Sequence, residues 1–129
     1  MNLNQITIAS TDVEKSVRYY ATLGLNLIVD ALPRYARFEC PEGESTFSIH
    51  HVDKLEHQET TIYFEVENLS EKVSQLKQKG ITFISDPEAK SWLWEEAHLY
   101  DPDGNKIIIY FAGANRKNPP WRITNSSSK

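Results

Sequence analysis

The chain has 129 residues, of which 40% are apolar, 25% charged and 11% aromatic, and this length and balance predict one globular domain with its own core. A net charge of −4 argues against nucleic acid as the main partner, because phosphate binding requires clustered lysine and arginine. No window approaches a membrane-spanning run of apolar residues, and the first ten residues lack the pattern of a secretion signal. With Cys40 as the only cysteine, we expect a cytoplasmic protein without membrane contact or internal disulfides.

The first part of the chain predicts a strand, a helix and three more strands. Apolar and polar residues alternate over residues 5–9, which is typical of a half-buried strand. Thr11 and Glu14 have the spacing of a capping box, and Gly24 suits a left-handed helix end. Between them, apolar side chains recur at helical spacing, at Val13, Val17, Tyr20 and Leu23. Strand-like runs follow at residues 25–30, 35–39 and 46–51, with a hairpin turn at 40–45.

The same order of elements returns 56 residues later. Residues 5–30 align on residues 61–86 without a gap, with identities at five of 26 positions. Asn68 with Glu71 is the second predicted helix cap, and Gly80 is the second helix end. Further strands are expected at residues 81–85, 92–100 and 106–112, with a turn at 101–105.

The repeat predicts an α+β fold built from two tandem βαβββ units, at residues 3–50 and 60–112. They form a single domain over residues 1–112 and are joined by a polar linker at 53–59. The tail at residues 113–129 shows no period, and we expect its serine-rich end to be disordered.

The paired units, the segment TDVEKSVRYYATLGL and the segment LYDPDGNKIIIY together resemble the vicinal oxygen chelate superfamily, the group of glyoxalases, bleomycin-resistance proteins and ring-cleaving dioxygenases. The resemblance covers about residues 3–112 and implies eight strands that form a curled, cup-shaped mixed sheet with the helices outside. It also implies a homodimer, and residues 119–122 (PPWR) are a candidate for part of the contact.

In that family a divalent metal usually sits in the cup, held by one side chain from each of four strands. The resemblance places these four positions on Gln5, Ser48, Thr61 and Ile108. Only Gln5 offers an acceptable ligand, because the two hydroxyls are poor ligands and the isoleucine offers none. We therefore expect that the usual metal set is lost and that no cofactor is bound.

Strand alternation, together with the resemblance, predicts which side chains line the cup. The predicted ligand-binding residues are Gln5, Thr7, Ser48, His50, Thr61, Tyr63, Glu65, Trp94, Glu96, His98, Ile108 and Tyr110. This aromatic and polar lining suits a flat or amphipathic small molecule better than a metal ion. The opposite strand face is apolar and is expected to pack against the helices, with Ile6, Ile8, Ile62, Phe64, Ile107, Ile109 and Phe111.

Three functions remain open at this point. The first is a binder of a small organic molecule that works without the metal. The second is a glyoxalase-like lyase or isomerase that uses His98 and Glu96 as acid and base, or a shifted metal held by His50, Glu96 and His98. The third is a scaffold domain with an unused cup, in which Glu96 merely satisfies His98.

Overall fold

The two predicted βαβββ units are present, each as a four-stranded sheet with one helix. The computed structural model describes residues 2–56 and 60–123. They divide into two compact units, which are taken separately below. The first holds the chain up to Thr61 together with Tyr100–Lys106, and the second holds Ile62–Leu99 together with the residues from Ile107 onward. The predicted α+β fold class is confirmed.

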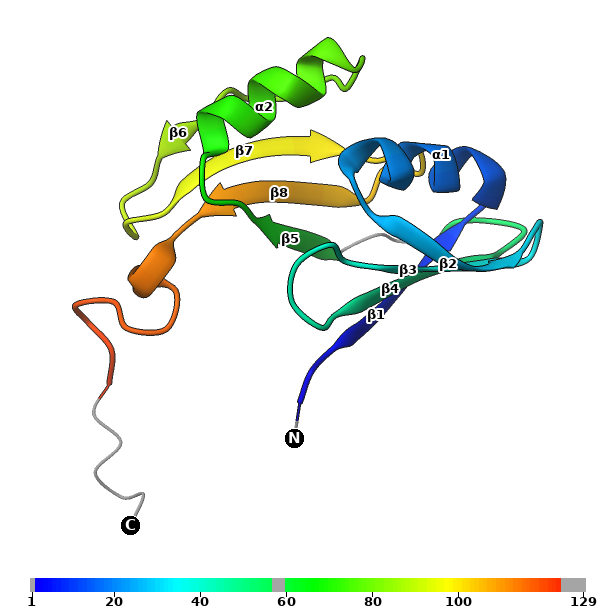
Figure 1. The fold of residues 1–129 in the computed structure, drawn as a ribbon, viewed down its shortest axis with the longest axis horizontal. Helices are drawn as coiled ribbons and strands as arrows, with labels where there is room; N and C mark the ends of the chain where they lie inside the picture. The colour runs from blue at the N-terminus through cyan, green and yellow to red at the C-terminus, as the bar shows by residue number, and fades with distance from the viewer. Residues whose placement is uncertain (1, 57–59, 124–129) are drawn as a thin grey trace. The chain divides into compact units, whose positions relative to one another are not determined.

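In the first unit the sheet has the strand order β1-β4-β3-β2. Strands β1 and β4 run parallel, while β3 is antiparallel to both of its neighbours. Helix α1 lies along one face of this sheet (Figure 1). The elements are β1 (Gln5–Ser10), α1 (Val13–Leu23), β2 (Asn26–Ala31), β3 (Tyr35–Glu39) and β4 (Thr46–His51).

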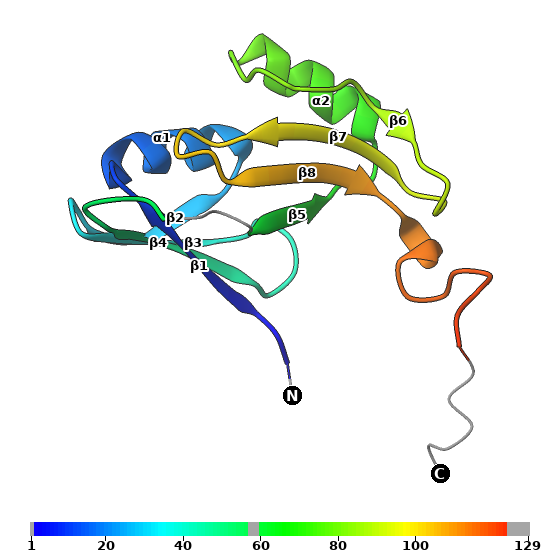
Figure 2. The same cartoon turned by 180° about the vertical axis from the view of Figure 1, so that it is seen from behind.

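In the second unit the sheet has the corresponding order β5-β8-β7-β6, and α2 covers one of its faces (Figure 2). A short 3-10 helix, η1 (Gly113–Asn115), follows the last strand. The other elements are β5 (Thr61–Glu65), α2 (Leu69–Gln78), β6 (Glu88–Ala89), β7 (Glu95–Tyr100) and β8 (Lys106–Phe111). Among the described residues, no helix is long and apolar enough to cross a membrane.

Helix α1 packs through an apolar stripe that ends at a glycine, as predicted. Tyr20 is fully buried, and its ring centroid lies 4.6 Å from that of Phe47 on β4. Gly24 ends the helix with φ of 117°, a conformation that few other residues adopt. The predicted cap at Thr11 is wrong, because the Asp12 side chain accepts the hydrogen bond from the Lys15 backbone N–H. The Asn68 cap of α2 is confirmed by its bond from the Glu71 N–H.

The turn at residues 101–105 joins β7 to β8 but packs within the first unit. Its first carboxylate, Asp101, accepts hydrogen bonds from the Tyr20 hydroxyl at 2.7 Å and from the Asn105 amide at 2.8 Å. Asp103 accepts bonds from the backbone N–H and the hydroxyl of Thr11, and from the Ser16 hydroxyl at 2.8 Å. The start of α1 is therefore fastened by residues more than 80 positions away.

The predicted strand at residues 81–85 is wrong. Ile81 is buried, but its N–H bonds to the Leu76 carbonyl, so its apolar character serves the end of helix α2. Ile84 and Ser85 both direct their N–H groups to the single carbonyl of His98, and this pattern does not form a ladder. Pro87 cannot donate at all, and pairing with β7 begins only at Glu88. The other late strands begin at Glu95 and Lys106.

The predicted apolar face of the strands is only partly buried. Ile8, Ile62, Ile107 and Ile109 are buried, whereas Ile6 is 39% exposed and Phe111 is 40% exposed. Both exposed residues lie near a strand end, since Ile6 is the second residue of β1 and Phe111 is the last of β8. Of the predicted tail, residues 124–129 lie outside the described part, as do residues 57–59 of the predicted linker.

Candidate functional site

The predicted lining residues are divided between the two units, and each unit gathers its own share. Gln5, Thr7, Ser48 and His50 lie on strands of the first unit, where Thr61 also begins β5. The second unit holds Tyr63, Glu65, Trp94, Glu96, His98, Ile108 and Tyr110.

The first unit forms a hydrogen-bond network on the strand face, and its predicted members are neutral side chains. The Gln5 amide donates to the Ser48 hydroxyl at 2.7 Å and to the Thr7 hydroxyl at 3.3 Å, and its oxygen accepts from the Thr46 hydroxyl. Strand β1 runs parallel to β4 with Thr7 paired to Ser48, so the pleat carries these side chains to the same face. His50 is exposed near the end of β4.

Two further members of this network were not predicted. The Tyr35 hydroxyl shares a hydrogen bond with Ser48 at 2.7 Å, and the Arg37 Nε donates to the Tyr35 oxygen at 2.8 Å. The bond to Ser48 and the neighbouring Arg37 hold the pKa of Tyr35 below its ordinary value. Arg37 pairs directly with Ser48 across antiparallel strands. The alternation of residues 35–39 could therefore have predicted that Tyr35 and Arg37 share a strand face with Ser48.

The second unit gathers its aromatic residues into one cluster. Trp94 and Tyr110 are stacked, with ring centroids 4.5 Å apart and planes 13° from parallel. Tyr63 meets both rings edge-on, at 6.0 Å and 5.7 Å. Ile108, Tyr110 and Ala112 alternate along β8 and form the buried floor against which Trp94 packs. Burial raises the pKa of the Tyr110 hydroxyl above its ordinary value, so this group stays protonated in neutral solution.

Glu65 binds the backbone of the residues that follow β8. Its carboxylate accepts the N–H groups of Ala112 and Gly113, at 2.8 Å and 2.9 Å, and lies 3.6 Å from the Arg116 side chain. Glu65 is thereby occupied with holding the start of η1. This local role differs from the ligand contact that the sequence suggested for it.

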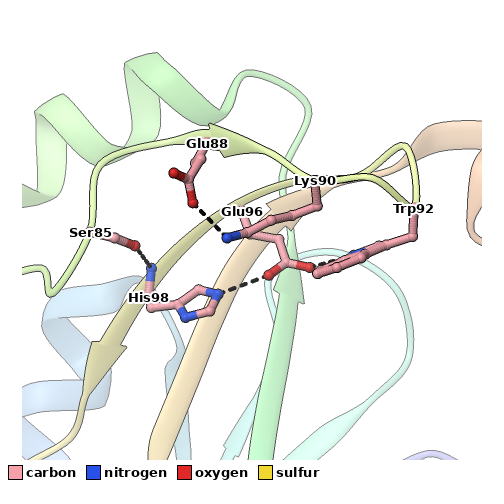
Figure 3. Close-up of polar contacts among 6 residues, drawn as sticks. All are labelled: Ser85, Glu88, Lys90, Trp92, Glu96 and His98. Carbon is pink, nitrogen blue, oxygen red and sulfur yellow. Dashed lines mark hydrogen bonds and ion pairs between the residues drawn. The ribbon is translucent and has the colours of Figure 1, made fainter.

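The second unit also brings Glu96 and His98 together, as their spacing on one strand face implied. The Glu96 carboxylate lies 2.8 Å from Nε2 of His98, and its other oxygen accepts from the Trp92 indole N–H at 2.8 Å (Figure 3). Trp92 was not among the predicted residues, because it lies in the loop before β7, where strand alternation does not apply. Within the described ranges, no three His, Cys, Asp or Glu side chains gather closely enough to hold a metal ion.

Comparison with known proteins adds a family and a set of related folds. Residues 2–109 match the model of the Glyoxalase/Bleomycin resistance protein/Dioxygenase superfamily. Among solved structures, a member of that superfamily from Sphaerobacter thermophilus DSM 20745 is 22% identical, with 86% of this chain and 97% of that chain covered and a TM-score of 0.71. No curated protein matches the chain.

Two other solved structures show how widely this fold is shared. A lactoylglutathione lyase from Agrobacterium tumefaciens is 12% identical, with 85% of this chain and 92% of that chain covered and a TM-score of 0.73. A bleomycin-binding protein in complex with bleomycin is 18% identical, with 86% and 98% covered and a TM-score of 0.71. At these identities the likeness establishes the fold alone.

Proposed function

The chain belongs to the Glyoxalase/Bleomycin resistance protein/Dioxygenase superfamily, and from this membership we propose that it binds a small organic molecule without the divalent metal usual in that group. The observation that carries the proposal is the aromatic cluster of the second unit, Tyr63, Trp94 and Tyr110 over Ile108. Stacked aromatic rings with polar side chains nearby are a common lining for flat or amphipathic ligands.

The donor chemistry at the family's metal positions supports a site without metal. Ile108 is 5% exposed and packed among apolar side chains, so it has no atom to offer an ion. Ser48 is a neutral hydroxyl, and its oxygen is already engaged with Gln5 and Tyr35. The Gln5 oxygen, the one acceptable ligand, takes the Thr46 hydroxyl instead. These residues do not fit a divalent cation.

The ligand class follows from the exposed part of the aromatic cluster. Tyr63 remains 51% exposed and can therefore contact a ligand, whereas Tyr110 is buried. A flat ring that stacks here gains burial and aromatic contact without disturbing the floor. The net charge of −4 favours cationic or neutral ligands over anionic ones.

Binding is tested by calorimetry with a panel of flat cationic and neutral aromatic compounds, including metal-free bleomycin. We expect at least one compound to bind and Trp94→Ala to weaken that binding about tenfold or more, since a stacked aromatic contact contributes on the order of 1–3 kcal/mol. Tyr100→Ala is the control, because Tyr100 is an exposed aromatic residue outside the cluster. Unchanged affinity in Trp94→Ala, or no binding by any compound, contradicts the proposal.

Metal content is tested separately by elemental analysis of protein prepared with nickel, zinc and manganese present. We expect far less than one metal per chain after dialysis. One tightly held ion per chain, or a clear rise in melting temperature on adding metal, contradicts the metal-free site.

A second candidate function is a glyoxalase-type lyase or isomerase, and the contact of 2.8 Å between His98 and Glu96 favours it. The two functions separate in the variant Glu96→Gln. An enzyme loses turnover of its substrate in this variant, whereas a binder alone shows no turnover either in the variant or in the unaltered protein.

We also propose that the chain forms a homodimer. Trp121 and Ile123 are exposed apolar side chains next to Pro119 and Pro120, and such residues favour burial against a partner. Sedimentation velocity at micromolar concentration should show a species of twice the 14.8 kDa chain mass. A single species at the chain mass contradicts the dimer.

A further inference from the structure

Glu96 is a buried carboxylate with a different donor on each oxygen. It is 4% exposed, and its Oε2 accepts the Trp92 indole N–H while its Oε1 lies 2.8 Å from Nε2 of His98. Figure 3 shows the carboxylate between the two rings, with the imidazole below it and the indole at its side. The three residues lie within seven positions of one hairpin.

The chemistry of these donors fixes where the protons are. An indole N–H can only donate, so Oε2 is an acceptor. An ionised carboxylate is acceptor-only, so the bond at Oε1 requires the proton on Nε2 of His98. In the neutral ring, Nδ1 then carries a lone pair. Nδ1 points away from Glu96, and it meets no hydrogen-bond donor among the described residues of the second unit (Figure 3).

The loop that carries Trp92 is held in a conformation that its sequence does not favour. Leu93 has φ of 68°, a left-handed value that is uncommon for a branched residue. The loop is closed on both sides by the bonds from Lys90 N–H to the Trp94 carbonyl at 2.8 Å and from Leu93 N–H to the Lys90 carbonyl at 3.0 Å. Backbone strain of this kind is often found at functional sites. Here it occurs next to Trp92, whose indole N–H contacts Glu96.

Two neighbouring charged side chains, Glu88 and Lys90, act on this pair. Glu88 lies directly opposite Glu96 across the β6–β7 pair, where two carboxylates repel each other. Lys90 forms an ion pair with Glu88 at 2.6 Å, and its positive charge also acts on Glu96 (Figure 3). The backbone of His98 is fixed as well, since its N–H donates to the Ser85 hydroxyl at 3.2 Å and its carbonyl accepts from Ile84 at 2.7 Å.

We propose that Trp92, Glu96 and His98 form a relay in which Nδ1 of His98 is the base and Trp92 and Glu96 are positioning residues. The relay rests on the second candidate function, since it supplies the base for an enzyme of that kind. Nδ1 takes a proton from a carbon, oxygen or nitrogen of the substrate, and Glu96 balances the charge of the imidazolium. His98 then returns the proton to a neighbouring atom of the same molecule. No other bond to the protein forms, so the reaction class is isomerisation by proton transfer.

The relay is tested by NMR of protein labelled with ¹⁵N in its histidines, without any ligand. We expect neutral His98 to carry its proton on Nε2 alone and to show that proton in a downfield resonance that exchanges slowly with water. Exposed His50 in the same spectrum is the internal reference. A proton on Nδ1, or a tautomer ratio and exchange rate equal to those of His50, overturns the proposal.

The role of Trp92 is tested in the variant Trp92→Phe, which keeps an aromatic ring and removes the N–H. Loss of one bond to the carboxylate should speed exchange of the His98 Nε2 proton about two- to threefold, because a hydrogen bond near the surface changes an equilibrium by about that factor. Tyr100→Phe is the control, because it also removes one polar hydrogen from an exposed aromatic side chain, and it should change nothing. An unchanged His98 resonance in Trp92→Phe shows that Trp92 only packs. Because these spectra need no ligand, failure of the binding experiments leaves their outcome intact.

Discussion

Asp101 in the first unit and Glu96 in the second are carboxylates of nearly equal burial, 5% and 4% exposed, but their surroundings differ. Asp101 accepts four hydrogen bonds: one from the Tyr20 hydroxyl, one from the Asn105 amide and two from backbone N–H groups. Each oxygen of Glu96 has one donor, and one of these donors is a histidine that reaches solvent. Burial alone therefore does not separate a structural carboxylate from one available for chemistry. The number and kind of hydrogen-bond donors around the carboxylate separate the two.

The largest expected effect comes from removing each carboxylate in turn. Asp101→Ala should lower the free energy of unfolding by about 3 kcal/mol, because it leaves several buried donors without an acceptor. Glu96→Ala should cost only about 1–2 kcal/mol, since Trp92 and His98 can both reach water. Urea unfolding measures both, and Asp53→Ala, at a fully exposed aspartate, is the control. Equal losses at the two sites contradict the comparison.

A substitution can place a third carboxylate in the second unit, at a position without hydrogen-bond donors. Ile108→Glu puts a charge into the apolar floor beneath Trp94 and Tyr110, and it should cost about 1–3 kcal/mol of stability. Ile108→Val is the matched control, with an expected loss of about 1 kcal/mol. Thermal unfolding with and without zinc checks both the loss and the expectation that one carboxylate confers no metal binding. Full stability of Ile108→Glu would mean that this position is not an apolar floor.

Removing one donor from each carboxylate makes a finer test. Tyr20→Phe deletes the hydroxyl on Asp101 in a fully buried site and should cost about 1–2 kcal/mol. Trp92→Phe deletes the donor on Glu96 near the surface and should cost less, about 0.5 kcal/mol. Urea unfolding of the two variants ranks them. If Trp92→Phe lowers the free energy of unfolding more than Tyr20→Phe does, Glu96 is the structural carboxylate and Asp101 is not.

The smallest expected effect is a dependence of stability on acid in the first unit. Burial by itself raises the pKa of Asp103, but hydrogen bonds from Ser10, Thr11 and Ser16 outweigh it and hold the pKa below its ordinary value. A lowered folded pKa contributes stability that is present above the unfolded value, about 4, and is lost as pH falls through the folded value. Melting temperature measured from pH 6 down to pH 2 should show this loss, and Asp103→Asn should reduce it.

Local periodicity was sufficient to predict the order of elements and most of their bounds. It failed where a local signal had another cause. Ile81 and Phe83 alternate like a strand, but Ile81 is apolar because it closes the end of helix α2. Thr11 has capping spacing, yet Asp103 takes its hydroxyl, and that partner lies 92 positions away. The internal repeat held the better signal for the cap, because it aligns Asp12 with Asn68.

Alternation also predicted which candidate residues share a strand face, and some of these residues contact one another within their unit. Tyr63, Trp94 and Tyr110 form one cluster, and Gln5 bonds to Ser48. Alternation could not predict the contacts of loop residues, because a loop has no regular period that fixes the direction of its side chains. Trp92 is the clearest case, because it lies in the loop before β7, next to the left-handed backbone at Leu93, and still reaches Glu96.

The first unit is discontinuous in the sequence, and this has a consequence for how the chain is made. Residues up to Thr61 leave the ribosome well before Tyr100–Lys106, which belong to the same unit. Until then the Tyr20 hydroxyl lacks its acceptor, and Thr11 and Ser16 lack the Asp103 carboxylate. Helix α1 and its sheet can pack together early. Their hydrogen bonds to Asp101 and Asp103 can form only after β7 has been synthesised. Folding of the N-terminal half is thus coupled to the arrival of the C-terminal half.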